Sequence, residues 1–460
     1  MEPDYSERSR LASLRVWAML VVTTALAIPV WPISSFASGQ EMQRLELADE
    51  PVFISADHPN PRIAQIGRLD GALLVGSSQV AFVDGVSQTL EFVDVATGAT
   101  WTAQADGTDV EIRPSLRILD RFDGLVVTDR SGSVTVFARN GQAVDQVAYD
   151  PFAMSFTSPA RAVGMFPDRR LIFRRSENAR PGFSLAALAG PGGIQRDTVR
   201  YETPTIGGSA TVLAKGFLDD EEIFLTTRAD GVTSSGTERI IFGQRLFEAR
   251  VGEQLVIVQT DRAQAAVYDW AGMRIAEFPI PGVRPQVTAE SVEAQRTLRI
   301  RAKERDNEVK RRAKELSYAE NFGAVYSTSR DSVRIAQLPA NDTAPSVDHL
   351  FGDLDGRVWL RLFAMPSDTV VYWRVWSVGR TNPEFELKLP RAKRLLDASG
   401  DLLLLRTTND FGADEFVIQR MITITDGHDQ LPARSSRSPQ SYTTQPVHDP
   451  NRSRHKRRQP

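Results

Sequence analysis

The sequence predicts an all-β protein, a β-propeller of six blades that carries a charged helical insertion. Three observations lead to this prediction. Short apolar runs separated by tight Gly turns fill most of the chain, as they do in antiparallel hairpins. A similar strand–turn–strand unit recurs every 45 to 53 residues or so where no insertion intervenes, which is the length of a four-stranded blade. The chain has no cysteine, so a large hydrophobic core has to replace disulfides.

The recurring unit pairs an apolar strand that follows an acidic or Gly turn with a later strand that ends in another turn. Its six copies contain the strands Ala72–Val75 and Leu90–Asp94, Leu125–Asp129 and Val134–Phe137, Leu171–Phe173, Leu255–Val258 and Ala266–Trp270, Val358–Arg361 and Trp373–Ser377, and Leu402–Leu405 and Phe416–Arg420. A four-stranded sheet can bury both faces only between neighbours in a closed ring. We expect that ring over about Leu45 to Met421, completed by a strand near Val52–Ile54. Seven blades are the alternative, if Gly216–Leu225 is a further copy rather than an elongated outer hairpin.

Residues 1–37 have the layout of a secretory signal peptide. Three arginines precede the uncharged run Val16–Val30, which is too short for a membrane span, and small residues favour cleavage near Ala37. The alternative is an uncleaved N-terminal anchor, because acidic residues dilute the positive charge of the first segment. Both interpretations place the rest of the chain outside the cytoplasm, so we expect a secreted or periplasmic protein.

The remaining chain divides into the propeller, residues 38–426, and a basic tail, residues 427–460. The tail is rich in Ser, Arg, Gln and Pro and lacks apolar periodicity, so it is predicted to be disordered. An exported chain rarely meets nucleic acid, and the net charge is only −3. We therefore expect no nucleic-acid partner, and a membrane partner only if the N-terminal segment stays uncleaved.

One segment, about 288–317, interrupts the strand pattern. It is dense in Glu, Lys and Arg, and Thr288 followed by Glu290 and Glu293 is typical of the start of a helix. We predict a charged surface helix inserted between blades. A helix this polar is usually a solvated face, and the alternative is a docking or lid element.

The sequence contains no catalytic, cofactor-binding or metal-binding motif that we can identify. The five histidines occur singly, so no zinc-type spacing exists, and neither a nucleophile elbow nor a phosphate loop occurs. Asp353, Asp355 and Gly356 resemble the start of a calcium loop, but strand residues follow at once. A tight turn explains these three residues better.

Two further groups have a structural explanation beside the functional one. The consecutive carboxylates of Asp219–Glu222 could bind a cation, but we interpret them as solvated loop residues. Trp359, Trp373 and Trp376 could form a sugar-stacking platform. Because they lie on strands with alternating residues, packing between blades is favoured.

A resemblance to a known group supports the fold. The stretches that carry it are Asp353–Arg361, Trp373–Trp376, Asp410–Val417 and Pro285–Ala294. They resemble the last blades, and the charged helix before them, of exported bacterial six-bladed β-propellers distantly similar to NHL-repeat propellers. The resemblance covers most of the predicted ring and implies the fold, without implying any chemistry. At Ala103–Val110 the chain departs from the Gly-rich Pro-Gly-Glu-Phe type connection that such proteins often have there.

One set of residues is a candidate ligand-binding rim. In a propeller the second strand of each blade runs to the loop-bearing face, and five of these strands end in an arginine. The five candidates are Arg130, Arg174, Arg262, Arg361 and Arg406. Their planar donors suit a carboxylate or other anionic partner. The alternative is that each arginine pairs with a neighbouring acid, such as Asp129 or Asp261, or is simply solvated.

Two classes of function remain open from the sequence. We favour a binding or scaffold module that presents its loops to a peptide, glycan or protein partner. The alternative is a hydrolase or lyase at the mouth of the central channel, where carboxylates and bases of different blades could converge.

Overall fold

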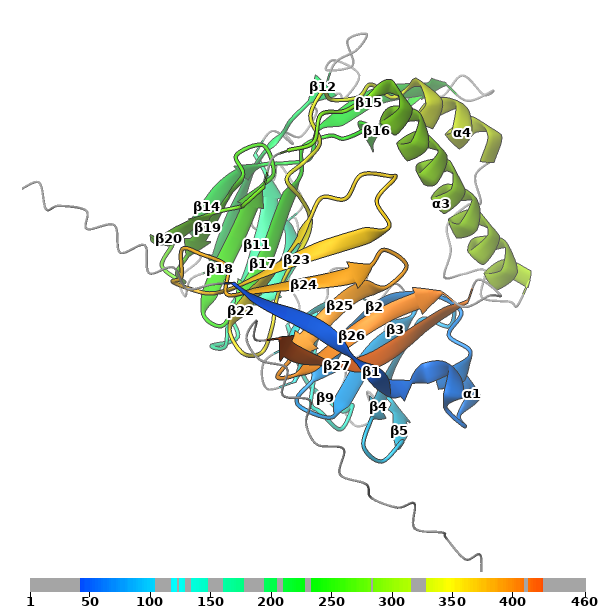
Figure 1. The fold of residues 1–460 in the computed structure, drawn as a ribbon, viewed down its shortest axis with the longest axis vertical. Coiled ribbons are helices and arrows are strands. Elements are labelled where there is room, and N and C mark those ends of the chain that lie inside the picture. The colour runs from blue at the N-terminus through cyan, green and yellow to red at the C-terminus, as the bar shows by residue number, and fades with distance from the viewer. Residues whose placement is uncertain are drawn as a thin grey trace, which may run out of the picture. The chain divides into compact units, whose positions relative to one another are not determined.

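Strands make up most of the chain that the structure describes, as the apolar runs predict (Figure 1). This computed structural model describes residues 42–103, 117–121, 124–128, 134–147, 160–177, 194–204, 210–227, 233–282, 284–315, 328–408 and 413–424. All of them belong to one unit, Glu41–Pro460. The predicted signal peptide, 1–37, and the predicted tail, 427–460, lie outside the described residues.

In the described part of the chain, four sheets contain four strands each, and neighbouring strands in them are antiparallel. The first two sheets consist of β2 (Leu69–Val75), β3 (Gln79–Asp84), β4 (Thr89–Asp94) and β5 (Thr100–Thr102), and of β6 (Arg117–Arg121), β7 (Leu125–Thr128), β8 (Val134–Phe137) and β9 (Ala143–Val147). The next two consist of β10 (Ala160–Met165), β11 (Leu171–Ser176), β13 (Thr198–Pro204) and β14 (Ala210–Phe217), and of β17 (Leu246–Val251), β18 (Gln254–Gln259), β19 (Gln264–Tyr268) and β20 (Arg274–Pro279).

A fifth, eight-stranded sheet joins two antiparallel groups of four strands. One group consists of β21 (Val347–Gly352), β22 (Arg357–Leu362), β23 (Val370–Ser377) and β24 (Phe385–Pro390), and the other of β25 (Arg394–Ser399), β26 (Leu402–Thr408), β27 (Asp414–Ile424) and β1 (Gln43–Ile54). A short parallel pairing of β1 with β24 links the two groups. A separate three-stranded sheet contains β12 (Ile194–Gln195), β15 (Glu221–Thr227) and β16 (Thr233–Arg239).

The groups of four strands follow one another in a propeller-like arrangement. Their first strands touch in sequence, since β2 contacts β6, β6 contacts β10, β10 contacts β17, β17 contacts β21, and β25 contacts β2. Clusters of buried apolar side chains join each group to the next; Val83 of β3 shares one with Val127 of β7. Leu74 of β2 shares another with Leu404 of β26, so the last group packs on the first. Each sheet therefore buries both faces, which is what holds a cysteine-free chain together.

The N-terminal strand closes the last group, as the sequence predicts. β1 pairs antiparallel with β27, with Phe53 opposite Ile418 and Ile54 opposite Val417. The predicted packing role of the three tryptophans is also confirmed. Trp359, Trp373 and Trp376 are fully buried in the apolar clusters between neighbouring groups of four strands.

The helices formed by the described residues lie outside these sheets and are η1 (Ser55–Asp57), α1 (Pro61–Ala64), α3 (Ala289–Glu315) and α4 (Thr328–Gln337). α3 is the predicted charged insertion. Thr288 is its N-cap, because its Oγ1 accepts the backbone N–H of Ser291 while the Ser291 Oγ accepts the N–H of Thr288. α4 was not predicted. No helix formed by the described residues is long and apolar enough to cross a membrane.

Candidate anion site

Strand direction brings several arginines to one end of the sheets. In an antiparallel sheet the start of the first strand and the end of the second lie at the same edge. Arg245 directly precedes β17, Arg394 begins β25, and Arg361 and Arg406 lie near the ends of β22 and β26. We call these four residues the arginine cluster.

The guanidinium groups of the arginine cluster influence one another. Burial lowers the pKa of Arg394 below its ordinary value, and the charges of Arg361, Arg406 and Arg245 lower it further, while the charge of Asp348 opposes them. The pKa of Arg245 is lowered by burial, by Arg239 and by Arg361. Like charges are therefore held close enough to disfavour one another's charged form.

Arg394 is the member of the arginine cluster with least compensation. It lies directly opposite Arg406 in the pairing of β25 with β26, and like charges at such positions destabilise a sheet. Its side chain is exposed to solvent, and it forms no hydrogen bond or ion pair with any residue that the structure describes. An anionic group in solution could therefore reach the guanidinium of Arg394.

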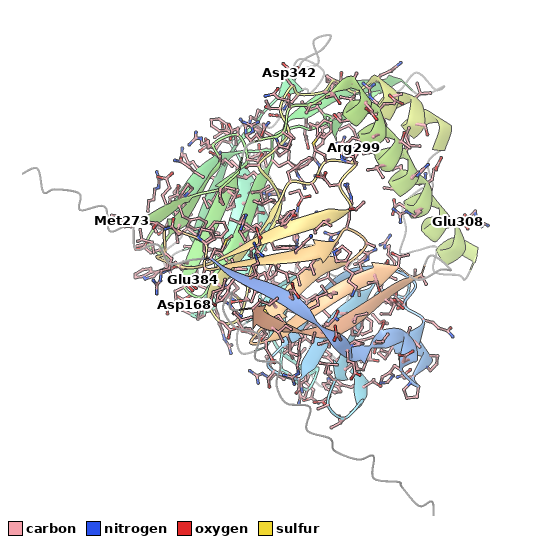
Figure 2. The ribbon with its side chains drawn as sticks, viewed as in Figure 1. Asp168, Met273, Arg299, Glu308, Asp342 and Glu384 are labelled. Atoms are coloured by element: carbon pink, nitrogen blue, oxygen red, sulfur yellow. The ribbon has the colours of Figure 1, made fainter. Side chains whose placement is uncertain are left out.

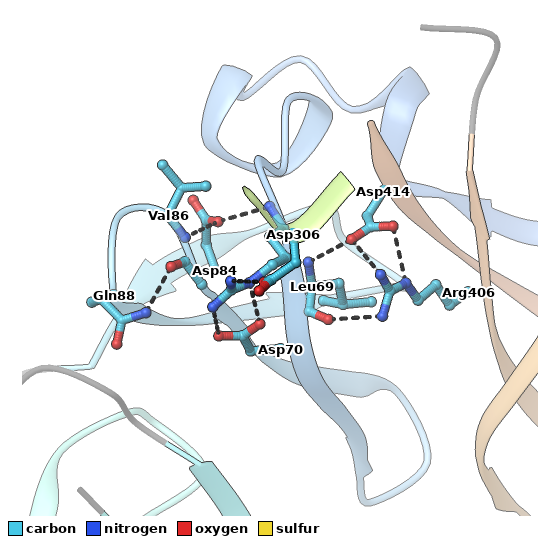
Figure 3. A network of polar contacts seen from close by, with 10 residues as sticks. Leu69, Asp70, Asp84, Val86, Gln88, Asp306, Arg406 and Asp414 are labelled. Carbon is cyan, nitrogen blue, oxygen red and sulfur yellow. Dashed lines mark hydrogen bonds and ion pairs between the residues drawn. The ribbon is translucent and has the colours of Figure 1, made fainter. Parts of the chain in front are cut away.

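Two other members of the arginine cluster have carboxylate partners. Arg406 donates two hydrogen bonds to Asp414, of 3.0 and 2.7 Å, and one of 3.1 Å to the carbonyl of Leu69 (Figure 3). Arg361 forms an ion pair with Asp348 of β21. Burial nevertheless raises the pKa of Asp348, against the opposing effect of Arg361. The acids fix these two arginines in place and leave the charges of Arg245 and Arg394 less balanced.

The histidine beside this cluster is neutral at physiological pH. Burial, followed by the charges of Arg394 and Arg361, lowers the pKa of His349 to about 3. Its ring meets the ring of Trp373 edge to face, with 5.8 Å between centroids. An imidazole with so low a pKa is a weak base at neutral pH, which counts against its use in hydrolysis.

Helix α3 bridges the end of the sheets at which the arginine cluster lies. Arg299 donates 2.5 and 2.8 Å hydrogen bonds to the carbonyls of Arg239, the last residue of β16, and Ile240, in the segment between β16 and β17. Asp306, two turns further along α3, lies 3.4 Å from the guanidinium of Arg68, which precedes β2 (Figure 3). Since both anchors precede the first strand of a sheet, α3 covers part of that end.

The structure separates the five rim arginines predicted from the sequence. Arg361 and Arg406 both lie in the arginine cluster. Arg174 instead forms an ion pair with Glu248 at 2.8 Å. Burial acts to lower the pKa of Arg174, but the Glu248 carboxylate acts against this, and the pKa is raised. Arg262 is exposed in the turn after β18, with its guanidinium 5.9 Å from the ring of Phe217. Arg130 lies outside the described residues.

Sequence reasoning missed Arg245 and Arg394. Arg245 directly precedes the first strand of its group, and Arg394 begins the first strand of its group. The start of a first strand lies at the same edge of the sheet as the end of the second strand, so the rule that predicted Arg361 and Arg406 applies to these two positions as well. An arginine placed directly before the apolar run of a first strand was therefore a usable signal.

The interpretation of Asp219 and Asp220 as solvated is wrong. The Asp219 carboxylate accepts the backbone N–H of Leu246, and that of Asp220 accepts the N–H of Gln244. Asp220 is buried and lies 3.5 Å from Arg196. These carboxylates bind the start of β17, a long-range role that a local run of acids does not reveal.

The tight-turn interpretation of Asp353 agrees with its contacts. Its carboxylate accepts hydrogen bonds from the backbone of Asp355 and Arg357 and, at 2.7 Å, from the indole of buried Trp359. Within the described residues, no three His, Cys, Asp or Glu side chains are grouped so that they could hold a metal ion.

Comparison with known proteins gives no family for this chain. No protein-family profile matches the sequence, and no curated protein matches it. Solved structures that align with it include a DUF4221 family member from Bacteroides vulgatus, at 9% identity and a TM-score of 0.39 over 84% of this chain and 97% of that chain. Others are a PQQ-bound aldose sugar dehydrogenase from Streptomyces coelicolor (11%, 0.35, 83% and 98%) and a streptogramin B lyase (10%, 0.30, 83% and 98%). The assignment of the fold rests on the sheet order and the apolar clusters.

Proposed function

We propose that the chain is an exported, six-bladed propeller that acts as a binding module for an anionic partner, with the arginine cluster as its docking site. Six groups of four strands, taken with β1 in the last, support the blade count. The layout of residues 1–37 supports a secreted or periplasmic location.

The observation that carries the proposal is the position of Arg394 opposite Arg406. Two guanidinium groups opposite each other on paired strands do not stabilise a sheet, and Arg394 forms no hydrogen bond or ion pair with a described acid. An anionic group bound between them would remove the repulsion and receive charge-assisted hydrogen bonds. The planar donors of arginine fit carboxylate or phosphate oxygens best.

The alternative function, a hydrolase or lyase, has less support. Such a site needs a base with a pKa near the working pH, placed within reach of the substrate. His349 has a pKa of about 3, and Asp348 is already paired with Arg361. A binding module needs neither residue to transfer a proton.

A binding experiment with an acidic peptide tests the proposal. A fluorescein-labelled oligoglutamate should bind the mature protein, with an affinity that falls as salt is raised. The variants Arg394→Gln and Arg245→Gln should each weaken binding about tenfold, because each loses a charge-assisted contact. Arg262→Gln is the matched control, an exposed arginine outside the arginine cluster, and should bind like the unmodified protein. An equal loss in all three variants would show only a general effect of net charge and would overturn the proposal.

A further inference from the structure

A second group of arginines lies between α3 and the segment that leads into β17. A cavity of about 70 Å³ separates them, and Arg239, Arg245 and Arg299 all line it. Gln295 lies one turn before Arg299 on α3, so both side chains face the cavity. Figure 2 shows Arg299 on the side of α3 toward the sheets and Glu308 on the opposite side. We call this cavity the α3 pocket.

The positive charges of the α3 pocket are poorly balanced. Arg299 donates to two backbone carbonyls, and no described carboxylate lies within ion-pair distance of it. The Nε of Arg245 is buried and has no hydrogen-bond acceptor among the described residues. The acid nearest to these groups, Asp219, lies 3.5 Å from the Nε of Arg239 and 3.9 Å from that of Arg245. One carboxylate thus lies near two guanidinium groups, and the third guanidinium, that of Arg299, forms no ion pair with a described acid.

The acid in the wall of the α3 pocket is already engaged. The Oδ2 of Asp220 accepts hydrogen bonds of 2.7 Å from the backbone of Gln244 and 3.0 Å from the amide of Asn341. Its Oδ1 lies 3.5 Å from Arg196. Asp220 therefore holds the pocket wall together and is not available to neutralise Arg299.

The environment of Arg299 reports the same excess of positive charge. Burial lowers its pKa to about 10, and the charges of Arg239 and Arg245 contribute to this while Glu238 opposes it. Like charges held close together disfavour one another's charged form unless an opposite charge joins them. The amide of Gln295, which has no hydrogen bond to a described residue, adds a neutral donor to the three cations.

We propose that the α3 pocket binds one tetrahedral oxyanion, the size of phosphate or sulfate, and that the bound anion fastens α3 to the sheets. The cavity has room for a single such group, and its donors come from both sides. Gln295 and Arg299 lie on α3, Arg239 lies at the end of β16, and Arg245 directly precedes β17. An anion between them contacts both elements at once. This site does not depend on the partner proposed for the arginine cluster, although Arg245 belongs to both.

Calorimetric titration of the mature protein with inorganic phosphate tests the inference. The unmodified protein should bind one phosphate, and Arg299→Met should weaken binding at least about tenfold, the factor expected for one lost charge-assisted hydrogen bond. Arg301→Met is the matched control, because Arg301 is an exposed arginine on the same helix. Its affinity should stay within about twofold. Arg299→Lys keeps the positive charge but lacks the planar guanidinium, so its phosphate affinity should fall less than that of Arg299→Met.

Hydrogen exchange gives the second readout. Phosphate should slow exchange of the α3 amides in the unmodified protein and in Arg301→Met, but not in Arg299→Met, whose fold is checked by circular dichroism. Glycerol phosphate distinguishes the source of the group: weaker binding than inorganic phosphate indicates a free ion, and equal or tighter binding indicates the head of a larger ligand. Absence of phosphate binding, or an equal loss in Arg301→Met, would overturn the inference.

The arginine cluster provides the remaining control. Arg394→Gln should leave phosphate affinity unchanged, since Arg394 does not line the α3 pocket. If Arg394→Gln abolishes phosphate binding as fully as Arg299→Met does, the anion belongs to the arginine cluster and the α3 pocket is not a site. Failure of the acidic peptide to bind, with phosphate binding intact, would overturn only the function proposed above.

Discussion

Replacing Arg394 with glutamine should make the fold more stable while it weakens ligand binding. Arg394 faces Arg406 across β25 and β26 and has no hydrogen bond or ion pair to a described residue to lose. A like-charged cross-strand pair costs about 0.2 to 1 kcal/mol, so we expect a gain of about 0.5 kcal/mol in the free energy of unfolding. Glutamine keeps much of the side-chain stem, and the bonds of Arg406 to Asp414 are untouched. Urea denaturation at low and high salt measures the gain.

Salt is the internal check on this prediction. The repulsion acts through solvent at an exposed side chain, so the gain should shrink as salt rises from about 0.05 to 0.5 M. Arg262→Gln is the control, because it removes an exposed arginine that is not paired opposite another arginine in a sheet. A stability of Arg394→Gln that is equal to or below that of the unmodified protein at low salt would refute the argument from like charges.

Three further predictions concern the fold and its pH dependence. Asp353→Ala should lower the free energy of unfolding by about 3 kcal/mol, because the buried indole N–H of Trp359 and two backbone N–H groups all lose their acceptor. A urea midpoint close to that of the unmodified protein would contradict this. Leu403→Ala should cost about 2 to 4 kcal/mol by leaving a cavity in a fully buried layer, measured in the same way. Between pH 6.5 and about 3 the unfolded state binds a proton at His349 that the folded state excludes, whereas above pH 6.5 both are neutral. Stability should therefore fall below pH 6.5 by up to about 1.4 kcal/mol per pH unit, and less steeply in His349→Asn.

The strands could be predicted because their cause is local. Runs such as Leu402–Leu405 and Leu255–Val258 are continuously apolar between turn residues, and each is buried on both faces as the second strand of its group. The charged insertion was equally visible, since a dense run of Glu, Lys and Arg has no place in such a sheet. α4 was missed because its burial depends on distant residues. Ile335 packs in one cluster with Ile241 and Phe242, which its own short sequence does not indicate.

The arginine cluster could be predicted only in part, since its assembly depends on register. Arg361 and Arg406 could be predicted because they lie at the ends of second strands. To predict that Arg394 lies opposite Arg406, one must also know the position of the bulge between Leu395 and Asp397. No local pattern fixes that position. The α3 pocket was beyond sequence reasoning for a similar reason, because Arg299 meets Arg239 only after α3 has folded back on the sheets.

The contacts between the groups of strands also explain how the arginine cluster can persist without a ligand. Long-range carboxylates fix the strands that carry it: Asp397 of β25 accepts the backbone N–H of Leu74 at 2.7 Å, and Asp414 of β27 accepts that of Leu69 at 2.9 Å. Arg394 begins a strand held in this way, so its main chain cannot move away from Arg406 to relieve the repulsion. A bound anion removes this repulsion, and its removal contributes to the binding free energy. In a flexible loop the two arginines would move apart before the anion binds, so that contribution would be absent.

The two proposed anion sites should oppose each other through Arg245. Its pKa responds to Arg239 on the side of the α3 pocket and to Arg361 on the side of the arginine cluster, so one guanidinium serves both sites. An anion in the α3 pocket neutralises part of the charge that attracts the acidic peptide. Phosphate should therefore weaken peptide binding more than chloride does at equal ionic strength, and by linkage the peptide should weaken phosphate binding by the same factor. Arg299→Met should abolish this difference between the two salts. A difference that persists in Arg299→Met would show that phosphate competes directly at the arginine cluster.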